Sequence, residues 1–294
     1  MRTLLGICCA LACAVGAGLA GTASAAQQVK LGVHLSPEHL GKGTTIEFSI
    51  EISAPGKLVP SPLSELDFRY PAKIGLLQSG LGRANCTAAA LESLGKGGCP
   101  ANALMGFGSA LLEIQVGREI VREAGAISIW MGPVAGEELQ LLFYASAATP
   151  ASEQLVFGGL LEEAGPPFGG SLDTRLPPIP WNPEAPPASI VRFIARIGPR
   201  NVTYYRRTGG HDIPYRPEGL RLPHSCPRGG FPFAGTFAFI DGTTSTAQTS
   251  VPCPPTLGLP GRPGPHAALA RSAHAPIDGY AACGVSPGLH MCRP

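Results

Sequence analysis

The chain has 294 residues and a formal net charge of +2 at pH 7, and only 14% of its residues are charged, against roughly 25% in typical soluble proteins. Glycine (39) and proline (31) approach the level of low-complexity chains, but a hydrophobic content of 44%, arranged in alternating runs, excludes that class. We expect a folded domain, with neither a nucleic-acid partner nor a cofactor.

The first 25 residues have the pattern of an export signal. A basic start at Met1-Arg2 precedes an uncharged apolar run from Leu4 to Ala20, and Ala23-Ser24-Ala25 forms a small-residue cleavage site. The run approaches the length of a membrane anchor, but the cleavage site that follows favours removal. We therefore predict a signal peptide over 1–25, a secreted protein, and no stable membrane span after cleavage.

Cysteine usage predicts disulfides. Six cysteines lie after the signal, and an even number in an exported chain favours bridges over metal ligands or redox thiols. There is no C-x-x-C pair, so we expect no metal site. Many connectivities are open to six cysteines. Pairing of neighbours is the simplest: Cys86–Cys99, Cys226–Cys253 and Cys283–Cys292, the last of which the sequence leaves open.

Alternating apolar residues predict strands along most of the chain, and Asn85 to Leu94 is the single convincing short helix, with Asn85 or Thr87 as its cap. Phe168 to Pro187 reads as a proline-rich crossover, in which Trp181 caps the core. The expected strands are Val29–Leu35, Gly43–Ile52, Leu66–Pro71, Leu104–Val116, Ala126–Trp130, Glu138–Ala147, Gln154–Leu161 and Ser189–Ile197.

The last predicted hairpin spans Phe231 to Pro254. Phe233, Gly235, Phe237 and Phe239 share one face, and Asp241-Gly242 is typical of a tight type I′ turn. With that turn, Cys253 would lie opposite Gly230, four residues from Cys226.

These elements predict an all-β fold: a sandwich of mainly antiparallel strands with one short helix and a proline-rich crossover. We expect one exported domain over 26–256, which could divide into two sub-sheets near 165–188. Residues 257–294 are rich in Gly, Pro, Ala and His, and we expect a poorly ordered tail there.

Catalytic signatures are absent from the sequence. Gly106-Phe107-Gly108-Ser109 lacks the spacing of a nucleophile elbow, and Pro37 keeps His34 and His39 from sharing one helix face. His211-Asp212 could supply part of a hydrolase triad, but adjacent strand residues point to opposite faces, so a loop tip explains them better.

Arginine is concentrated in one segment. Between Arg192 and Arg228 lie eight arginines and two acids, Asp212 and Glu218, a net of +6 in 37 residues. Strand alternation directs Arg192 and Arg196 outward, and we expect both to be unpaired by carboxylates, with Phe193 and Ile197 buried.

Two interpretations of this segment remain open. Arginine beside tyrosine suits phosphate, sulfate or carboxylate groups on an anionic cell-wall polymer. A solvated face that keeps an apolar protein soluble is the interpretation that residue types alone favour. The candidate binding residues are Arg192, Arg196, Arg200, Arg206, Arg207, Tyr204 and Tyr205.

Five motifs follow one another along the chain: Leu66-Asp67-Phe68-Arg69-Tyr70-Pro71, Asn85-Cys86-Thr87, Cys99-Pro100, Phe237-Ala238-Phe239-Ile240-Asp241-Gly242 and Val251-Pro252-Cys253-Pro254. As an ordered set they resemble the motifs of uncharacterised secreted β-rich proteins of high-GC Gram-positive bacteria. The resemblance implies export, β architecture and disulfides, and no catalytic activity. The chain departs from the pattern at Ala103-Leu104-Met105-Gly106 and in the extra tail beyond Pro255.

The leading functional hypothesis is a non-enzymatic exported envelope protein with a structural or binding role, in contact with anionic polymer. The alternative is a secreted hydrolase whose site the sequence does not reveal. A deep pocket that joins His211 or His224 to a serine and a carboxylate would favour the enzyme. The sequence does not determine the oligomeric state.

Overall fold

A computed structural model describes residues 27–76, 84–134, 139–147, 154–180, 186–198, 204–215, 220–254, 281–283 and 290–292. The predicted signal peptide, Trp181, Arg200 and most of the predicted tail lie outside these residues. Within 257–294 the structure describes two short paired strands, β16 (Ala281–Cys283) and β17 (His290–Cys292).

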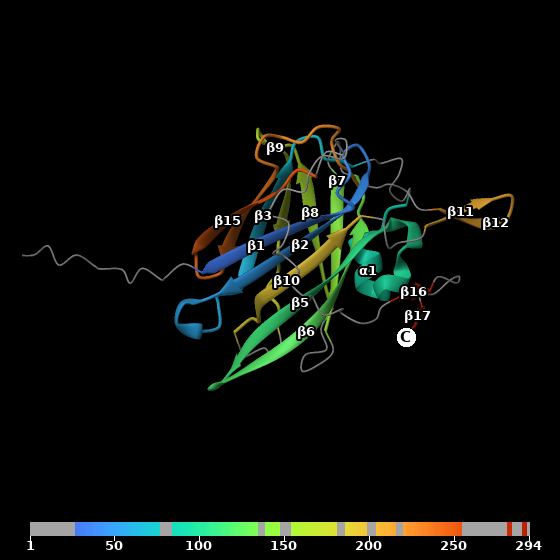
Figure 1. The fold of residues 1–294 in the computed structure, drawn as a ribbon. Coiled ribbons are helices and arrows are strands. Elements are labelled where there is room, and N and C mark those ends of the chain that lie inside the picture. The colour runs from blue at the N-terminus through green and yellow to red at the C-terminus, as the bar shows by residue number, and fades with distance from the viewer. Residues whose placement is uncertain are drawn as a thin grey trace, which may run out of the picture.

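The body is one continuous antiparallel ladder of 13 strands that curls around a shared core (Figure 1). The strand order is β15-β14-β3-β9-β8-β7-β6-β5-β10-β2-β13-β4. β1 lies outside this order and pairs with β2. The strands are β1 (Gln28–Ser36), β2 (Gly43–Ser53), β3 (Leu63–Pro71), β4 (Gly75–Leu76), β5 (Leu104–Val116), β6 (Glu119–Met131), β7 (Leu139–Ser146), β8 (Gln154–Glu162), β9 (Phe168–Arg175), β10 (Ser189–Ile197), β13 (Leu220–Arg221), β14 (Phe231–Phe239) and β15 (Thr244–Val251).

The sheet curls round until β1, which pairs with β2, lies side by side with the end strand β15. Two side-chain contacts join them at one end: Ser245 Oγ donates a hydrogen bond to the Gln27 carbonyl, and Gln27 Nε2 donates to Asp241 Oδ2 at 3.3 Å. The sheet is therefore a nearly closed barrel with two facing layers. The predicted all-β class and antiparallel pairing are confirmed.

Period-two alternation places the core between the layers. In β2, Ile46, Phe48 and Ile50 are buried, while Glu47 and Glu51 face outward. Burial of each such apolar side chain contributes about 1.5–3 kcal/mol to folding. The equivalent inward positions of β3, β6, β7, β9 and β14 contribute to the same core.

The predicted helix is present as α1 (Ala88–Leu94), and Thr87 is its N-cap, because Thr87 Oγ1 accepts a hydrogen bond from the Ala90 amide at 3.2 Å. The short 3-10 helices η2 (Gly95–Gly98) and η3 (Ala101–Ala103) follow it, and η1 (Pro55–Lys57) follows β2. The fully buried Leu91 joins Trp130 and Tyr144 in a second apolar cluster. Phe143 faces the main core, and the next residue, Tyr144, faces this second cluster. Strand β7 is therefore buried on both faces.

The disulfides Cys86–Cys99 and Cys226–Cys253 are both present, with Cα–Cα distances of 5.2 and 5.7 Å. The first closes the chain around α1, and the second joins the open end of the β14–β15 hairpin. Both predicted pairings are confirmed.

The turn of this hairpin differs from the predicted tight type I′ turn. The Phe239 amide donates to the Thr243 carbonyl and the Gly242 amide to the Phe239 carbonyl, each at 3.0 Å, so the loop has three residues. Within 239–243, Gly242 alone has positive φ, at 81°. A left-handed residue after the turn adds one residue to the loop and moves the register by one. Phe231 accordingly pairs with Val251 rather than with Pro252.

The crossover begins later than predicted. Phe168 to Arg175 contains no proline and forms β9, with Leu172 and Thr174 buried and Asp173 on the opposite face. The prolines start at Pro177, after β9. The chain then passes from β9 in one layer to β10 in the other, and the Ala188 amide donates to the Ile179 carbonyl at 2.9 Å on the way.

Candidate functional site

Arg192 and Arg196 project outward from β10 and are exposed, as alternation predicts. Their neighbours in β2 are acidic: Arg192 is in register with Glu51 and Arg196 with Glu47. Arg196 Nε forms an ion pair with Glu47 Oε2. The expectation that both arginines are unpaired is therefore wrong for Arg196, because a strand 149 residues earlier supplies the carboxylate.

The same acids have basic partners in β1, so two rows of charge run across three strands. We call these rows the charge ladder; its members are Lys30, Glu51 and Arg192 in one row and His34, Glu47 and Arg196 in the other. Opposite charges directly across from one another, Lys30–Glu51–Arg192 and Glu47–Arg196, favour the sheet and leave little net positive charge on this face. The charge ladder is better explained as sheet stabilisation than as a polyanion site.

The inward side of β10 is less buried than predicted. Ala195 is fully buried, whereas Phe193 and Ile197 are half-buried and pack against the core. The predicted division of faces holds, and the predicted complete burial of Phe193 and Ile197 does not.

Two further candidate arginines lie on a separate two-stranded ribbon, β11 (Tyr204–Thr208) and β12 (His211–Tyr215), which projects from one side of the body (Figure 1). Tyr205 is 39% exposed, and Arg207 is exposed two residues further on the same face. Tyr204 and Arg206 occupy the register positions opposite Tyr215 and Ile213.

The base of the ribbon is fixed to the body. Tyr215 is half-buried and packs against the cluster beneath α1. In that cluster Lys96 Nζ lies 5.9 Å from the ring centroid of Tyr144. Burial lowers the pKa of Lys96 and raises the pKa of Tyr144.

The arginines of this segment that lie within the described residues therefore do not form one face. Arg192 and Arg196 belong to β10, Arg206 and Arg207 to the ribbon, and the exposed Arg228 to the loop before β14. The sequence concentrates them in one segment, but the topology distributes that segment over distant elements.

An acidic groove on the outer face of β3, β8 and β9 was not predicted. It has a volume of about 440 Å³ and holds five carboxylates and one arginine. Its charged residues are Glu65, Asp67, Arg69, Glu162, Glu163 and Asp173. Strand alternation by itself predicts that the acids of β3 point outward. The groove also needs acids from β8 and β9, about 100 residues later, and the sequence pattern does not show that these strands lie beside β3.

The histidines of the hydrolase alternative are both exposed. His211 follows the Gly209-Gly210 turn at the tip of the ribbon, as expected for a loop tip. His224 lies close to Gly41, where a Cβ atom would approach its Nδ1 to 2.6 Å. Neither lines the acidic groove or the interior cavity described below.

Among the described residues, no group of three His, Cys, Asp or Glu side chains is placed to hold a metal ion. None of the helices in the described part of the chain combines the length and apolar character needed to cross a membrane.

Comparisons of the chain with protein families, with curated proteins and with solved structures found no match. Function must therefore be argued from the geometry of the chain itself.

Proposed function

We propose that this chain is an exported, disulfide-stapled β protein of the cell envelope that acts by binding rather than by catalysis. Membership of the secreted bacterial group that it resembles is part of the same proposal. The two disulfides support export, because such bridges persist in oxidising compartments.

The proposed contact surface is the β11–β12 ribbon, and the proposed partner is an anionic wall polymer. The observation that carries this proposal is the exposure of Tyr205 and Arg207 on one face of a projecting ribbon. A guanidinium binds phosphate or carboxylate by paired hydrogen bonds, and an adjacent aromatic ring adds stacking area. Arg200 and Arg206 stay in the proposed set as neighbours in the chain.

One arginine of the candidate set is less suited to a polymer contact. In the charge ladder, Arg196 is already paired with Glu47, so its positive charge is less open to a polymer. The acidic groove would repel the same polymer, which leaves the ribbon as the favoured approach.

The test is retention on immobilised anionic wall polymer, with long-chain polyphosphate as a defined probe. We expect the wild type to be retained at about 0.01 M salt and released at about 1 M, where the screening length falls from about 30 to about 3 Å. Tyr205→Ala/Arg207→Ala should lose retention at low salt. The control variant, Arg192→Ala/Arg196→Ala, removes two arginine charges where the ribbon variant removes one, and should still lose less retention.

Equal retention of the ribbon variant and the wild type would overturn the ribbon assignment. Absence of retention of the wild type at low salt would overturn polymer binding altogether. If Arg192→Ala/Arg196→Ala loses more retention than Tyr205→Ala/Arg207→Ala, the polymer contact lies on β10 instead.

A further inference from the structure

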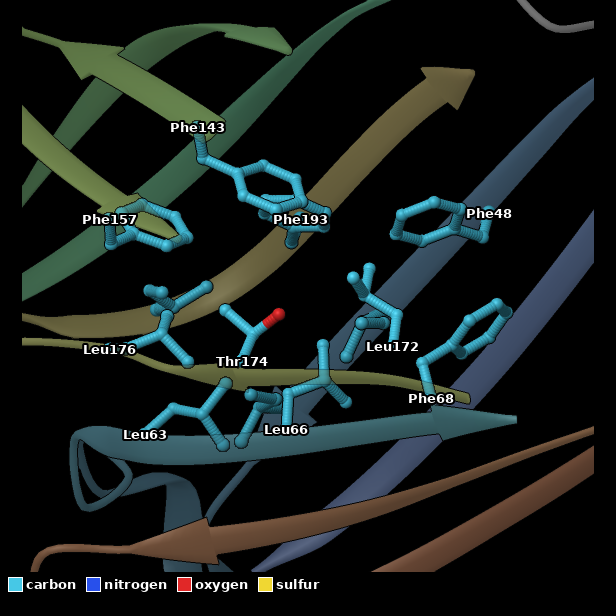
Figure 2. A pocket seen from close by; sticks show the side chains of 13 residues that line it. Phe48, Leu63, Leu66, Phe68, Phe143, Phe157, Leu172, Thr174, Leu176 and Phe193 are labelled. Atoms are coloured by element: carbon cyan, nitrogen blue, oxygen red, sulfur yellow. The ribbon is translucent and has the colours of Figure 1, made fainter. Parts of the chain in front are cut away.

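The cavity inside the barrel is part of the packed core (Figure 2). Its volume is about 30 Å³, and its walls come from β2, β3, β7, β8, β9, β10 and the start of the crossover. Of its 13 lining residues, 12 are apolar, and the other, Thr174, is 3% exposed. A space of this size holds about one water, so this cavity has no room for an organic ligand.

The two disulfides differ in their access to solvent. Cys86 and Cys99 are 2% and 8% exposed and belong to the apolar cluster beneath α1. Cys253 is exposed, whereas Cys226 is half-buried and packs against the main core. Thiol–disulfide exchange begins when a thiolate reaches one of the two sulfurs. A dissolved thiolate therefore has access to Cys253, but it reaches Cys86 or Cys99 only if the cluster beneath α1 opens.

The chain around the exposed disulfide is basic. The segment before Cys226 is tied to the turn before β2, because the Gly41 amide donates to the Leu222 and Pro223 carbonyls, each at 3.1 Å. A positive environment stabilises a thiolate, and a stabilised thiolate is a better leaving group in exchange. The ionisable residues in 38–42 and 221–228, other than cysteine, are Lys42, Arg221, Arg228, His39, His224 and one acid, Glu38.

The disulfide also fixes the middle of a loop, residues 224–229, which joins β13 to β14. All six residues except Cys226 are exposed. Apart from the disulfide, hydrogen bonds hold this loop near its ends: Gly41 binds the Pro223 carbonyl, and Ser250 Oγ donates to the Gly229 carbonyl at 2.7 Å. The paired residues Phe231 and Val251 that follow are both buried. Opening the disulfide would therefore free the loop while the β14–β15 ladder stays in place.

We propose that the Cys226–Cys253 disulfide is a site of reversible exchange with an external dithiol, and that its reduction releases loop 224–229 from the body. The Cys86–Cys99 disulfide stays closed under the same conditions. This inference is independent of the polymer contact proposed for the ribbon.

The exchange proceeds in two steps. A thiolate of the dithiol attacks Cys253 Sγ, the bond between the two cysteines breaks, and its electron pair leaves on Cys226 as a thiolate. The second thiolate of the dithiol then attacks its own sulfur in the mixed disulfide and releases Cys253. The dithiol is oxidised to a cyclic disulfide, and its two protons pass to Cys226 and Cys253.

The first test uses dithiothreitol as the probe on the full folded chain. Samples are quenched with iodoacetamide over time and mapped as peptides. Cys226 and Cys253 should be alkylated at least about tenfold faster than Cys86 and Cys99, because the buried pair reacts only through opening of its cluster. Equal rates for the two pairs, or faster alkylation of Cys86 and Cys99, would overturn the proposal.

Glutathione, which has a single thiol, tests the order of attack. With iodoacetamide present to trap the released thiolate, the glutathione adduct should lie on Cys253 and the alkyl group on Cys226. The reverse assignment would contradict attack at the exposed sulfur.

Trypsin tests the release of the loop, since Arg228 lies within it. Cleavage after Arg228 should be about tenfold faster in the reduced and alkylated chain than in the oxidised chain, because the freed loop fits a protease more readily. Cys226→Ser/Cys253→Ser should match the reduced chain. Cleavage after the exposed Arg118, in the β5–β6 turn, is the internal control and should not change. An unchanged rate at Arg228, or an equal increase at both sites, would overturn local release.

Discussion

Phe48 of β2 and Phe68 of β3 stack across the interior, with ring centroids 5.0 Å apart and planes inclined by 25°, although their strands are not neighbours in the sheet. Each ring also stacks on a neighbour in its own layer: Phe48 on Phe193 at 5.8 Å and Phe68 on Phe233 at 6.0 Å. Four rings thus connect β10, β2, β3 and β14. The contact between Phe48 and Phe68 holds the two layers together at the middle of the barrel.

This stack predicts a large effect of truncation. Phe48→Ala should lower the free energy of unfolding by about 3–5 kcal/mol, because it leaves a cavity and removes the contact between layers. Phe107→Ala is the matched control, since Phe107 is 39% exposed on the outer face, and should cost well under half as much. Urea unfolding of both variants measures the difference, and similar losses would show that the stack does not join the layers.

A second prediction concerns Gly106 in β5, within the Gly106-Phe107-Gly108 segment that gave no catalytic motif. A Cβ atom at Gly106 would lie 2.0 Å from the Arg196 carbonyl oxygen in β10, so the backbones approach too closely for any side chain. Gly106→Ala should cost about 1–3 kcal/mol through forced separation of these strands. Gly97→Ala, with no heavy atom within 4 Å of the added methyl group, should be nearly neutral in the same unfolding assay.

The sequence predicted local features well, since these depend on neighbouring residues. Alternation identified β2 and its buried face, the helix signals identified α1, and cysteine spacing identified both disulfides. Each of these depends on residues that lie close together in the chain. β9 was missed because the proline-rich stretch after it dominated the interpretation of the segment.

Long-range relationships were not predictable. The pairing of Arg196 with Glu47 depends on β10 lying next to β2, and nothing in either strand specifies that neighbour. The cavity around Thr174 depends on six strands that enclose it, although its hydroxyl stands out only as one threonine in an alternating run. The hairpin register was off by one because Asp-Gly is compatible with both two-residue and three-residue loops.

The third prediction concerns the Cys226–Cys253 disulfide, which links residues separated by 27 positions. In the chain-entropy description, a loop of this length stabilises the fold by about 3–4 kcal/mol. Cys226→Ser/Cys253→Ser should lower the free energy of unfolding by about that amount, and the Cys86–Cys99 bridge should remain. Non-reducing peptide mapping checks the remaining bridge, and an unchanged unfolding midpoint in the double variant would contradict the expected contribution.

The fourth prediction concerns Arg196 and Glu47. Both side chains are partly exposed, so a double-mutant cycle with Arg196→Ala and Glu47→Ala should give a coupling free energy of roughly 0–1 kcal/mol that decreases with salt. A coupling above this range, insensitive to salt, would mean that the charge ladder is more shielded from solvent than its exposure indicates.

The last prediction is that the stability of the fold varies with pH through Asp241, which lies in the turn next to the β1–β15 contact. Burial by itself would raise the pKa of this carboxyl, but hydrogen bonds from Thr243, Gln27 and Ser61 outweigh burial and hold the pKa below its ordinary value of 3.8. Thr243 donates from both its hydroxyl and its amide to Asp241 Oδ1, at 2.7 and 3.0 Å. The ionised carboxylate therefore stabilises the folded chain more than the unfolded one.

Because the folded pKa is the lower of the two, this stabilisation is present above the unfolded pKa and is lost as the pH falls through the folded pKa. The unfolding temperature of the wild type should therefore fall more steeply below about pH 4 than that of Asp241→Asn, which cannot titrate there. Asp212→Asn, which removes a carboxylate from the β11–β12 ribbon, is the matched control and should follow the wild-type curve. The prediction is wrong if the unfolding temperatures of Asp241→Asn and the wild type fall in parallel between about pH 5 and pH 2. The hydrogen bonds in the turn would then not favour the ionised carboxylate, and the contact between Gln27 and Asp241 would contribute no charge-dependent stability.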